Sequence, residues 1–289
     1  MKKKQTIVPH ALDKADYHVH PGYSLDASGT VDQYCRRALE LGIQEICFTT
    51  HYDSDPFRKE IDPFVQIDGQ VVPLSAESVQ RYIDDVRKAG EKYGPSGLAV
   101  RVGLEVDYAP HIEEKLRHEL TRFDLDYRLG AVHCLDHIAI SASNEAEEYF
   151  KTKSAGEMLS EYYRVLRRAV QSGLFDVMAH LDIYKKYGLG FYGEEILAGQ
   201  SGLVESALEL MVENDVGIEI NTGVLRKGHK EFCPAPEIVE LALEKRVKIV
   251  AYGSDAHRVD QLGEGIKEAY LAVGELRSKI NPKSKTAAG

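Results

Sequence analysis

The sequence contains no long apolar run, no closely spaced cysteine pair and almost no clustered basic residues, and each absence excludes a class of protein. No apolar stretch is long enough to span a bilayer, and no hydrophobic segment follows the lysines at positions 2–4. We therefore expect no membrane partner and no secretory signal. The 4 cysteines form no Cys-x-x-Cys pair, which argues against a disulfide framework, a zinc finger and an oxidising compartment. A cytoplasmic location is expected.

The charge balance argues against a nucleic-acid partner. The formal net charge is -10, and the sequence has no basic tract apart from Lys2, Lys3 and Lys4. Proteins that follow a phosphate backbone usually carry a basic patch. The chain has 289 residues, of which 43% are hydrophobic and 28% charged, an ordinary composition for a globular protein. We predict one domain over residues 1–289, with Cys47 and Cys134 as small core residues.

Strand-like and helix-like segments alternate along the whole chain. We predict strands at 16–20, 45–51, 98–108, 127–135, 176–181, 217–223 and 248–254, and helices at 30–41, 75–93, 110–122, 155–173, 202–214, 236–246 and 261–279. Such alternation is typical of an α/β protein with parallel strands. Because candidate ligands follow most of these strands, closure into a TIM-like barrel with one mouth is favoured over an open sheet.

Three connections are longer than the alternation requires. In the segment 52–74, two strand-like runs flank Asp68-Gly69, a common turn of β-hairpins. We interpret this segment as a hairpin excursion over the site. The polar segment 141–153 and the Gly-rich segment between the fifth strand and the next helix are expected to be loops.

Histidine and carboxylate side chains gather near the ends of the predicted strands. Side chains alternate along a strand, so in Asp16-Tyr17-His18-Val19-His20 the two histidines point the same way and can hold one metal ion between them. Similar residues recur along the chain, and the candidate ligands are His18, His20, Asp26, His51, Glu105, His133, His180, Asp255 and His257.

These side chains are typical ligands of zinc, iron and manganese. They are too many for one ion and suit a cluster of two or three, in which Glu105 can bridge two ions. The alternative is that individual members are ordinary polar residues. For the whole set this is disfavoured, because unpaired buried polar groups are costly. Four further histidines are interpreted as ordinary polar residues: His10, His111, His118 and His229. His137 is intermediate and is a candidate for lining the mouth of the barrel.

Several motifs resemble those of the polymerase-and-histidinol-phosphatase (PHP) family, in order and spacing over nearly the whole chain. They are DYHVH at 16–20, the strand-end His51, GLEVD at 103–107, GAVH at 130–133, MAHLD at 178–182 and GSDAH at 253–257. The resemblance implies a distorted seven-stranded (β/α)7 barrel with a trinuclear metal site. It assigns His18, His20, Glu105 and Asp255 to one ion, Glu105, His133 and His180 to a second, and Asp26, His51 and His257 to a third. Some family members have His where this chain has Asp26.

Two further segments resemble the histidinol-phosphate phosphatases within that family: EINTGVLRK at 219–227, and HLD at 180–182 followed by KKYG at 185–188. The resemblance implies that Arg226 grips the substrate phosphate, a role that suits a planar guanidinium. Asp255 and His257 are further candidate catalytic residues. Lys185 and Lys186 could assist, but both are interpreted as solvated lysines.

The expected function is therefore a metal-dependent phosphomonoesterase that hydrolyses L-histidinol phosphate in histidine biosynthesis. One alternative is another phosphoesterase of the same family, such as an exonuclease or a nucleotide phosphatase, which the acidic net charge disfavours. A second is a non-catalytic, metal-stabilised module, which the complete set of candidate ligands disfavours. The expected partner is a small phosphate monoester, and the expected cofactors are zinc, manganese or iron ions.

Overall fold

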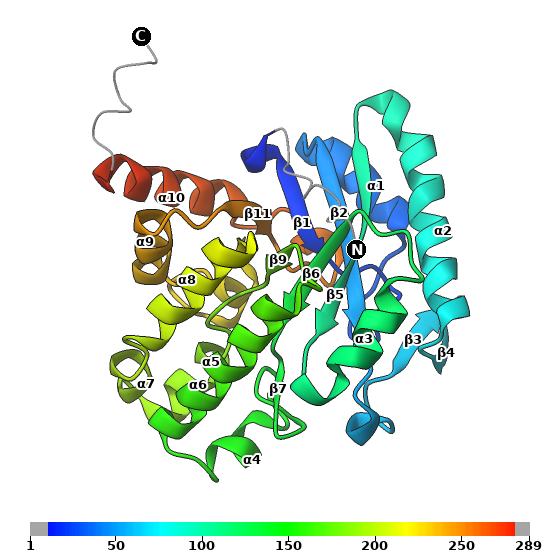
Figure 1. Ribbon diagram of the computed structural model, residues 1–289. Coiled ribbons are helices and arrows are strands. Elements are labelled where there is room, and N and C mark those ends of the chain that lie inside the picture. Colours follow the sequence, from blue (N-terminus) through cyan, green and yellow to red (C-terminus); the bar gives the residue numbers. More distant parts are fainter. Residues whose placement is uncertain (1–10, 281–289) are drawn as a thin grey trace.

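The predicted alternation of strands and helices is present in the computed structural model, which describes residues 11–280. Seven parallel strands follow one another in chain order around a nearly closed barrel (Figure 1), which confirms the predicted fold class. The strands are β1 (Ala15–Val19), β2 (Glu45–Tyr52), β5 (Ala99–Asp107), β6 (Tyr127–Ala131), β9 (Val177–Met178), β10 (Gly217–Asn221) and β11 (Ile249–Gly253).

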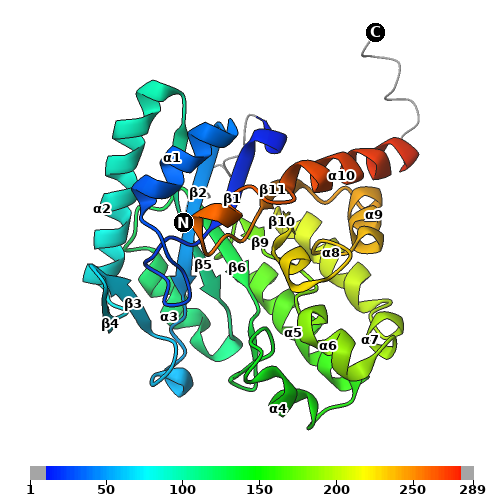
Figure 2. The ribbon, with the colours of Figure 1, turned by 180° about the vertical axis from the view of Figure 1, so that it is seen from behind.

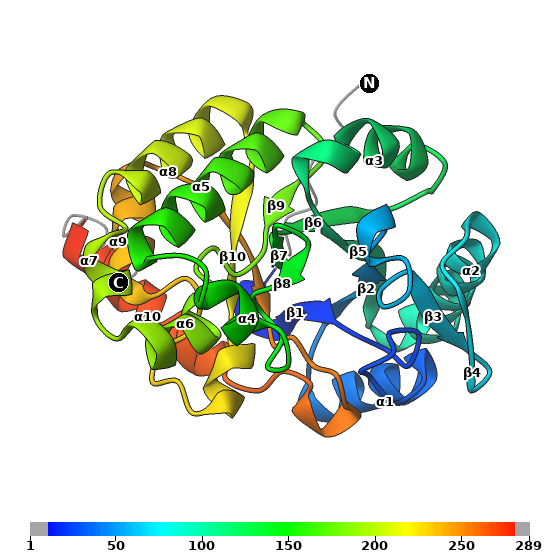
Figure 3. The same ribbon diagram turned by 90° about the horizontal axis from the view of Figure 1, so that it is seen from below.

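The pairing of the strands brings distant parts of the chain to one end of the barrel. In the long pairing between β2 and β5, His51 lies directly beside Glu105. The first and last strands approach each other through an isolated parallel bridge between Val19 and Ala256. Because the strands are parallel, their carboxyl ends share one face of the barrel. Figure 3 shows the ring of strands viewed roughly along the strands.

The helices surround the strands (Figures 1 and 2). Thr30, Ser75 and Ser154 begin three of them with capping boxes, in which side chains satisfy the free amide groups of the first turn. The helices are α1 (Val31–Leu41), α2 (Ala76–Tyr93), α3 (Glu113–Leu120), α4 (Ala146–Phe150), α5 (Ala155–Ser172), α6 (Lys185–Tyr192), α7 (Glu195–Ala198), α8 (Leu203–Asn214), α9 (Pro236–Glu244) and α10 (Ile266–Ile280).

Two sets of buried side chains support the barrel. The larger set packs strands against the surrounding helices, and a smaller set comes from the barrel strands and their ends. In the smaller set, the rings of Tyr17 and Tyr127 meet edge to face with centroids 5.2 Å apart. Cys47 and Cys134 are buried, as predicted. Within residues 11–280, no helix has the length and apolarity that crossing a membrane requires.

The structure corrects two of the predicted strands and two of the predicted loops. The fourth strand ends at Ala131, and His133 precedes a small hairpin of β7 (Cys134–Leu135) and β8 (Ile138–Ala139). The His133 amide donates a 2.7 Å hydrogen bond to the Asp107 carboxylate, which takes it out of the strand ladder. The fifth strand is also shorter than predicted. The expected loops contain α4, α6 and α7, and α4 buries Tyr149 and Phe150 among the acidic residues that made this segment look like a loop.

The predicted hairpin is present as β3 (Phe64–Ile67) and β4 (Gln70–Pro73). Its turn residues, Asp68 and Gly69, have φ angles of 51° and 79°, the left-handed values that such a tight turn requires. The hairpin itself lies beside α2 (Figures 1 and 3), and it is the segment leading to it that reaches the mouth of the barrel. Among the histidines interpreted as ordinary, His10 lies outside the described residues.

Candidate metal centre

The Glu105 carboxylate on β5 lies at the centre of the predicted site. Its side chain is 1% exposed, and its two oxygens face different groups of histidines. Oε2 lies 3.3 Å from His18 Nε2 and 3.4 Å from His20 Nε2, at the end of β1. The Asp255 carboxylate, just after β11, approaches the same two nitrogens at 3.6 and 3.3 Å. These four side chains form the first group.

The second group uses the other oxygen of Glu105. Oε1 lies 3.0 Å from His180 Nε2 and 3.3 Å from His133 Nε2, and the two nitrogens are 3.3 Å apart. His180 has a φ of 23°, outside the ordinary range of a β-strand, because the chain turns sharply after β9. Two histidine side chains therefore meet one carboxylate oxygen from two neighbouring strand ends.

The third group lies next to the first. His257 Nε2 is 3.2 Å from the Asp26 carboxylate, and His51 Nε2 is 3.7 Å from it. His51 also reaches Glu105, with Nδ1 3.0 Å from Oε2. The rings of His51 and His257 both flank that of His20, with centroids 4.2 Å away. The structure thus brings all of the predicted ligands into three adjoining groups.

The geometry of these groups fits metal ions. At metal–ligand bonds of about 2.0–2.1 Å, neighbouring tetrahedral ligand atoms lie about 3.3–3.4 Å apart, close to the distances within the first two groups. The Nε2 atoms of His18 and His20 are buried and lack a hydrogen-bond partner within the described residues. Buried nitrogens without a partner are costly, and a bound cation would satisfy them. The site therefore has several clusters of side chains that can hold metal ions.

The pKa shifts of Glu105 and His20 suit a cation. Burial alone would raise the pKa of Glu105, but the imidazoles of His18 and His133 hold that pKa well below its ordinary value. Burial and the neighbouring imidazoles of His51 and His257 lower the pKa of His20 to about 3. A charged carboxylate and a neutral imidazole with a free electron pair are the forms in which these residues bind metals. Burial lowers the pKa values of His18, His51 and His133, but neighbouring carboxylates raise them by more, so an incoming ion would displace protons from these three rings.

A further carboxylate orients the His18 ring by contacting the ring nitrogen that faces away from the metal-ligand groups. The Glu219 carboxylate on β10 lies 2.7 Å from His18 Nδ1 and fixes the ring so that Nε2 faces Glu105. Gly253 leaves the room that this contact needs, since a Cβ atom there would lie 2.2 Å from Glu219 and 2.4 Å from His18. The sequence analysis missed Glu219. Its alternation with Asn221 on the sixth strand was the available signal.

Asp53 and Asp107 are two further carboxylates that the sequence analysis missed. They lie with His133 in a group whose possible ligand atoms are all within 4.8 Å of one another. Burial raises the pKa of Asp53 to about 7. One Asp53 oxygen is buried and has no hydrogen-bond partner within residues 11–280. Asp53 follows His51 by two positions, so strand alternation could have indicated it.

Arg226 lies beside the site rather than in the cavity. One guanidinium nitrogen donates a 2.6 Å hydrogen bond to the backbone carbonyl of Asp255, and another lies 3.5 Å from the Glu264 carboxylate. It does not line the cavity that contains the three groups. The interpretation of Lys185 as a solvated lysine is wrong, because its side chain is 7% exposed and its amine lies 3.0 Å from the Asp182 carboxylate. Lys186 does line the cavity.

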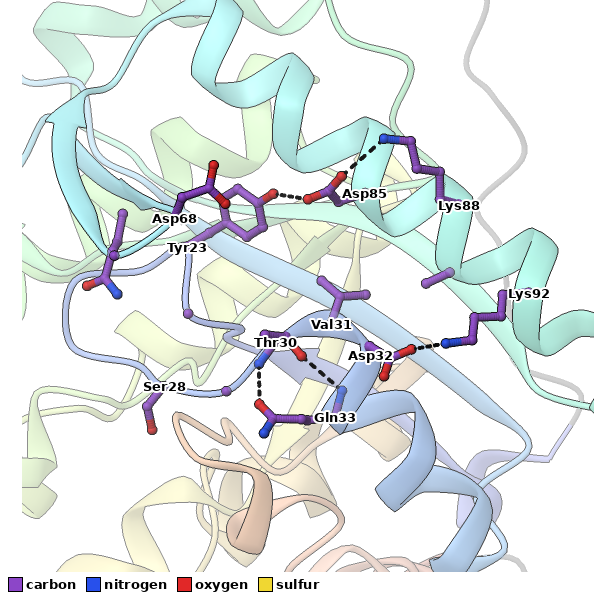
Figure 4. Close-up of a pocket in the computed structure, with 15 residues that line it drawn as sticks. Tyr23, Ser28, Thr30, Val31, Asp32, Gln33, Asp68, Asp85, Lys88 and Lys92 are labelled. Carbon is purple, nitrogen blue, oxygen red and sulfur yellow. Dashed lines mark hydrogen bonds and ion pairs between the residues drawn. The ribbon is translucent and has the colours of Figure 1, made fainter.

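The three groups open into a cavity of about 540 Å³. Its outer wall includes Arg58, Asp62 and Glu145 from the long connections. A different cavity lies between α1, α2 and the loop after β1 (Figure 4). There Lys92 is paired with Asp32 and Lys88 with Asp85, and none of the lining residues belongs to the predicted ligands.

The family described as PHP domain matches residues 16–223. A Deinococcus radiodurans protein named "Probable histidinol-phosphatase" is 30% identical over 267 residues, which span 90% of this chain and 93% of that protein. The Bacillus subtilis protein named "Histidinol-phosphatase" is 26% identical, over 90% of this chain and 99% of that protein.

A solved structure shares the fold. It is a histidinol phosphate phosphatase from Lactococcus lactis, described as complexed with zinc, L-histidinol and phosphate. The two structures have a TM-score of 0.72 at 17% identity, and the match covers 92% of this chain and 94% of the other. The family match spans more than half of the chain, and the Deinococcus relative is similar over most of its length. This chain therefore belongs to the PHP domain family.

Proposed function

We propose that this protein is a metal-dependent phosphomonoesterase that hydrolyses L-histidinol phosphate to L-histidinol and phosphate. The observation that carries the proposal is the Glu105 carboxylate, which lies within 3.0–3.4 Å of histidine nitrogens on both of its oxygens. A carboxylate in this position suits a bridge between two cations. The names of the Deinococcus and Bacillus relatives support the choice of substrate.

Two or three divalent ions, of zinc, manganese or iron, would be held in the three groups. His18, His20, Glu105 and Asp255 would hold one, Glu105, His133 and His180 a second, and Asp26, His51 and His257 a third. Ions in such a site lower the pKa of water and neutralise the charge that develops on phosphoryl oxygens. The role of the protein is to fix the ligands in place, and the contact from Glu219 to His18 serves this purpose.

The distribution of charge in the cavity suits a substrate with one anionic and one cationic end. The phosphate would face the metal ligands. The rest of the substrate would face a wall that contains Asp53 and the ion-paired group of Arg58, Asp62 and Glu145. L-Histidinol phosphate carries an ammonium group, and the Asp53 carboxylate, which lines the cavity, can accept a hydrogen bond from it. A nucleotide has no such group next to its phosphate.

Arg226 is proposed to act at the phosphate end. Its Nη2 donates to the Asp255 carbonyl, and its Nη1 is buried, makes no hydrogen bond among the described residues and lies 3.5 Å from the Glu264 carboxylate. To reach a phosphate oxygen, the side chain would have to turn away from Glu264 and towards the cavity. Lys186, which lines the cavity, is a second cation available to the phosphate.

A comparison of substrates tests this proposal. The metal-loaded protein would be assayed for phosphate release from L-histidinol phosphate, from its analogue without the amino group, and from a nucleoside 5′-monophosphate. We expect the highest kcat/KM for L-histidinol phosphate and a lower value for the analogue. A preference for the nucleotide would place the protein in a different branch of the family, and no hydrolysis of any phosphate monoester would support a non-catalytic role.

A further inference from the structure

A second group of metal-ligating side chains lies outside the predicted metal centre. The Asp55 carboxylate is flanked by two imidazoles, with Oδ1 2.9 Å from His111 Nε2 and Oδ2 2.8 Å from His137 Nδ1. The possible ligand atoms of these three residues all lie within 4.8 Å of one another. None of the three lines the cavity of the predicted centre.

The three residues come from three separate connections at the carboxyl ends of the strands. Asp55 follows β2, His111 follows β5, and His137 lies in the turn between β7 and β8. The side chain of Asp55 is 7% exposed, and those of His111 and His137 are 34% and 39% exposed. The carboxylate is therefore fixed inside the protein, while the imidazoles remain open to ions from the solvent.

The backbone at His137 belongs to a tight turn, and an aromatic ring packs against its side chain. Asp136 and His137 have φ angles of 47° and 65°, the left-handed values of a two-residue hairpin turn. Glycine adopts these values at the least cost, and among other residues asparagine, aspartate and histidine are the ones most often found there. The ring of Phe57 packs against the His137 ring with centroids 4.3 Å apart, although Phe57 is 71% exposed. Phe57 thus covers one side of the group.

We propose that Asp55, His111 and His137 form a separate site for one divalent transition-metal ion, with zinc as the best match. Two histidines and one carboxylate are a common ligand set for zinc and for iron(II), with the remaining positions taken by water. Neighbouring ligand atoms around such ions lie about 3.0–3.4 Å apart at bonds of 2.0–2.1 Å. Outward movements of a few tenths of an ångström at each imidazole would admit the ion.

Such an ion would connect three loops at the rim of the barrel. It would also act on the wall of the main cavity, because the backbone carbonyl of His137 accepts a 2.7 Å hydrogen bond from Arg58. Arg58 in turn holds Glu145, with a 2.6 Å contact, and Asp62. The second site would therefore stabilise the ion-paired wall of the cavity without contributing a ligand to the main centre.

Zinc binding by wild-type protein and variants tests the proposal. After the main centre has been saturated, equilibrium dialysis against increasing zinc would measure the additional bound ion. We expect about one additional equivalent in the wild type, and at least tenfold weaker binding of it in His111→Gln and His137→Gln. His118→Gln is the matched control, because His118 is an exposed histidine on α3 that belongs to none of the metal-ligating groups. It should behave as the wild type does.

A second readout, the melting temperature, does not depend on catalytic activity. In the wild type, the zinc concentration that binds at this site should also raise the melting temperature, by a shift that both glutamine variants lose and His118→Gln keeps. Equal zinc binding by the wild type and the His111 and His137 variants, with equal shifts in melting temperature, would overturn the proposal. Asp55, His111 and His137 would then only connect the loops through hydrogen bonds.

Discussion

Replacing Glu105 by glutamine tests the arrangement of the metal centre at its most connected residue. Glutamine keeps the size of the side chain and one oxygen, but an amide nitrogen takes the place of the other oxygen and cannot bind a cation. In the structure, Oε2 lies 3.3 and 3.4 Å from His18 and His20, and Oε1 lies 3.3 and 3.0 Å from His133 and His180. Whichever way the amide is turned, one group loses its oxygen and both lose the negative charge.

The expected effect is large. Changes to residues that only support a metal ligand typically cost 10–100-fold in metal affinity or activity. Loss of a ligand shared by two ions should exceed this, so we expect kcat/KM for L-histidinol phosphate to fall by more than about 100-fold, which corresponds to about 2.7 kcal/mol. Elemental analysis after gel filtration should show a loss of about two ions per chain, because one carboxylate serves two groups.

Glu145→Gln is the matched control for this experiment. It makes the same chemical change in a carboxylate of the cavity wall that belongs to none of the metal-ligating groups. Its metal content should equal that of the wild type. If Glu105→Gln also keeps the wild-type metal content, Glu105 is not a shared ligand and the proposed bridge is refuted.

Three further predictions follow from the same geometry. Asp26→Ala should lower the metal content by about one ion, since its carboxylate approaches His257 and His51; unchanged content with normal kinetics would leave Asp26 a role in the loop alone. Arg226→Ala should lower kcat/KM for L-histidinol phosphate roughly tenfold to a thousandfold or more at normal metal content, because losing a charge-assisted contact from a desolvated site typically costs about 2–5 kcal/mol. Arg226→Lys should recover part of the loss, whereas a loss of metal in Arg226→Ala would show that the residue supports Asp255 instead. Hydrogen bonds from Arg58 hold the pKa of Glu145 below its ordinary value of 4.5. The contribution of the Arg58–Glu145 pair to folding stability is therefore complete above pH 4.5, and it is lost as the pH falls through the lowered pKa of Glu145. Denaturant unfolding of metal-free protein should show a smaller loss of stability on acidification in Glu145→Gln than in the wild type, and equal losses would contradict this reasoning.

The elements of the barrel could be predicted from the sequence because the signals that mark their ends are local. Capping residues such as Thr30 and Ser75, and the Asp68-Gly69 turn, determine the backbone within a few positions, and the structure has each element where these signals predict it. The segment at α4 was misjudged because three buried side chains, Ala146, Tyr149 and Phe150, are interspersed with acidic residues. Their burial depends on tertiary packing, which local composition does not contain.

The convergence of the candidate ligands could be predicted from the sequence, but the contacts that support them could not. Histidines and carboxylates after successive strands of a barrel must converge, since parallel strands end on one face. By contrast, Glu219 reaches His18 across 201 positions of sequence, and Asp55 joins His111 and His137 across 56 and 82 positions. Such contacts are set by the closure of the barrel and by the paths of its loops. The burial of Lys185 against Asp182 has the same origin.

Metal titration of metal-free protein, with phosphate release from L-histidinol phosphate as the readout, tests the central claim most directly. The protein would be stripped by chelation, and zinc, manganese or iron(II) would then be added in steps while bound metal and initial rate are measured together. The account predicts no turnover without metal and a rate that rises as two or three ions bind per chain. Full turnover by rigorously metal-free protein would contradict it.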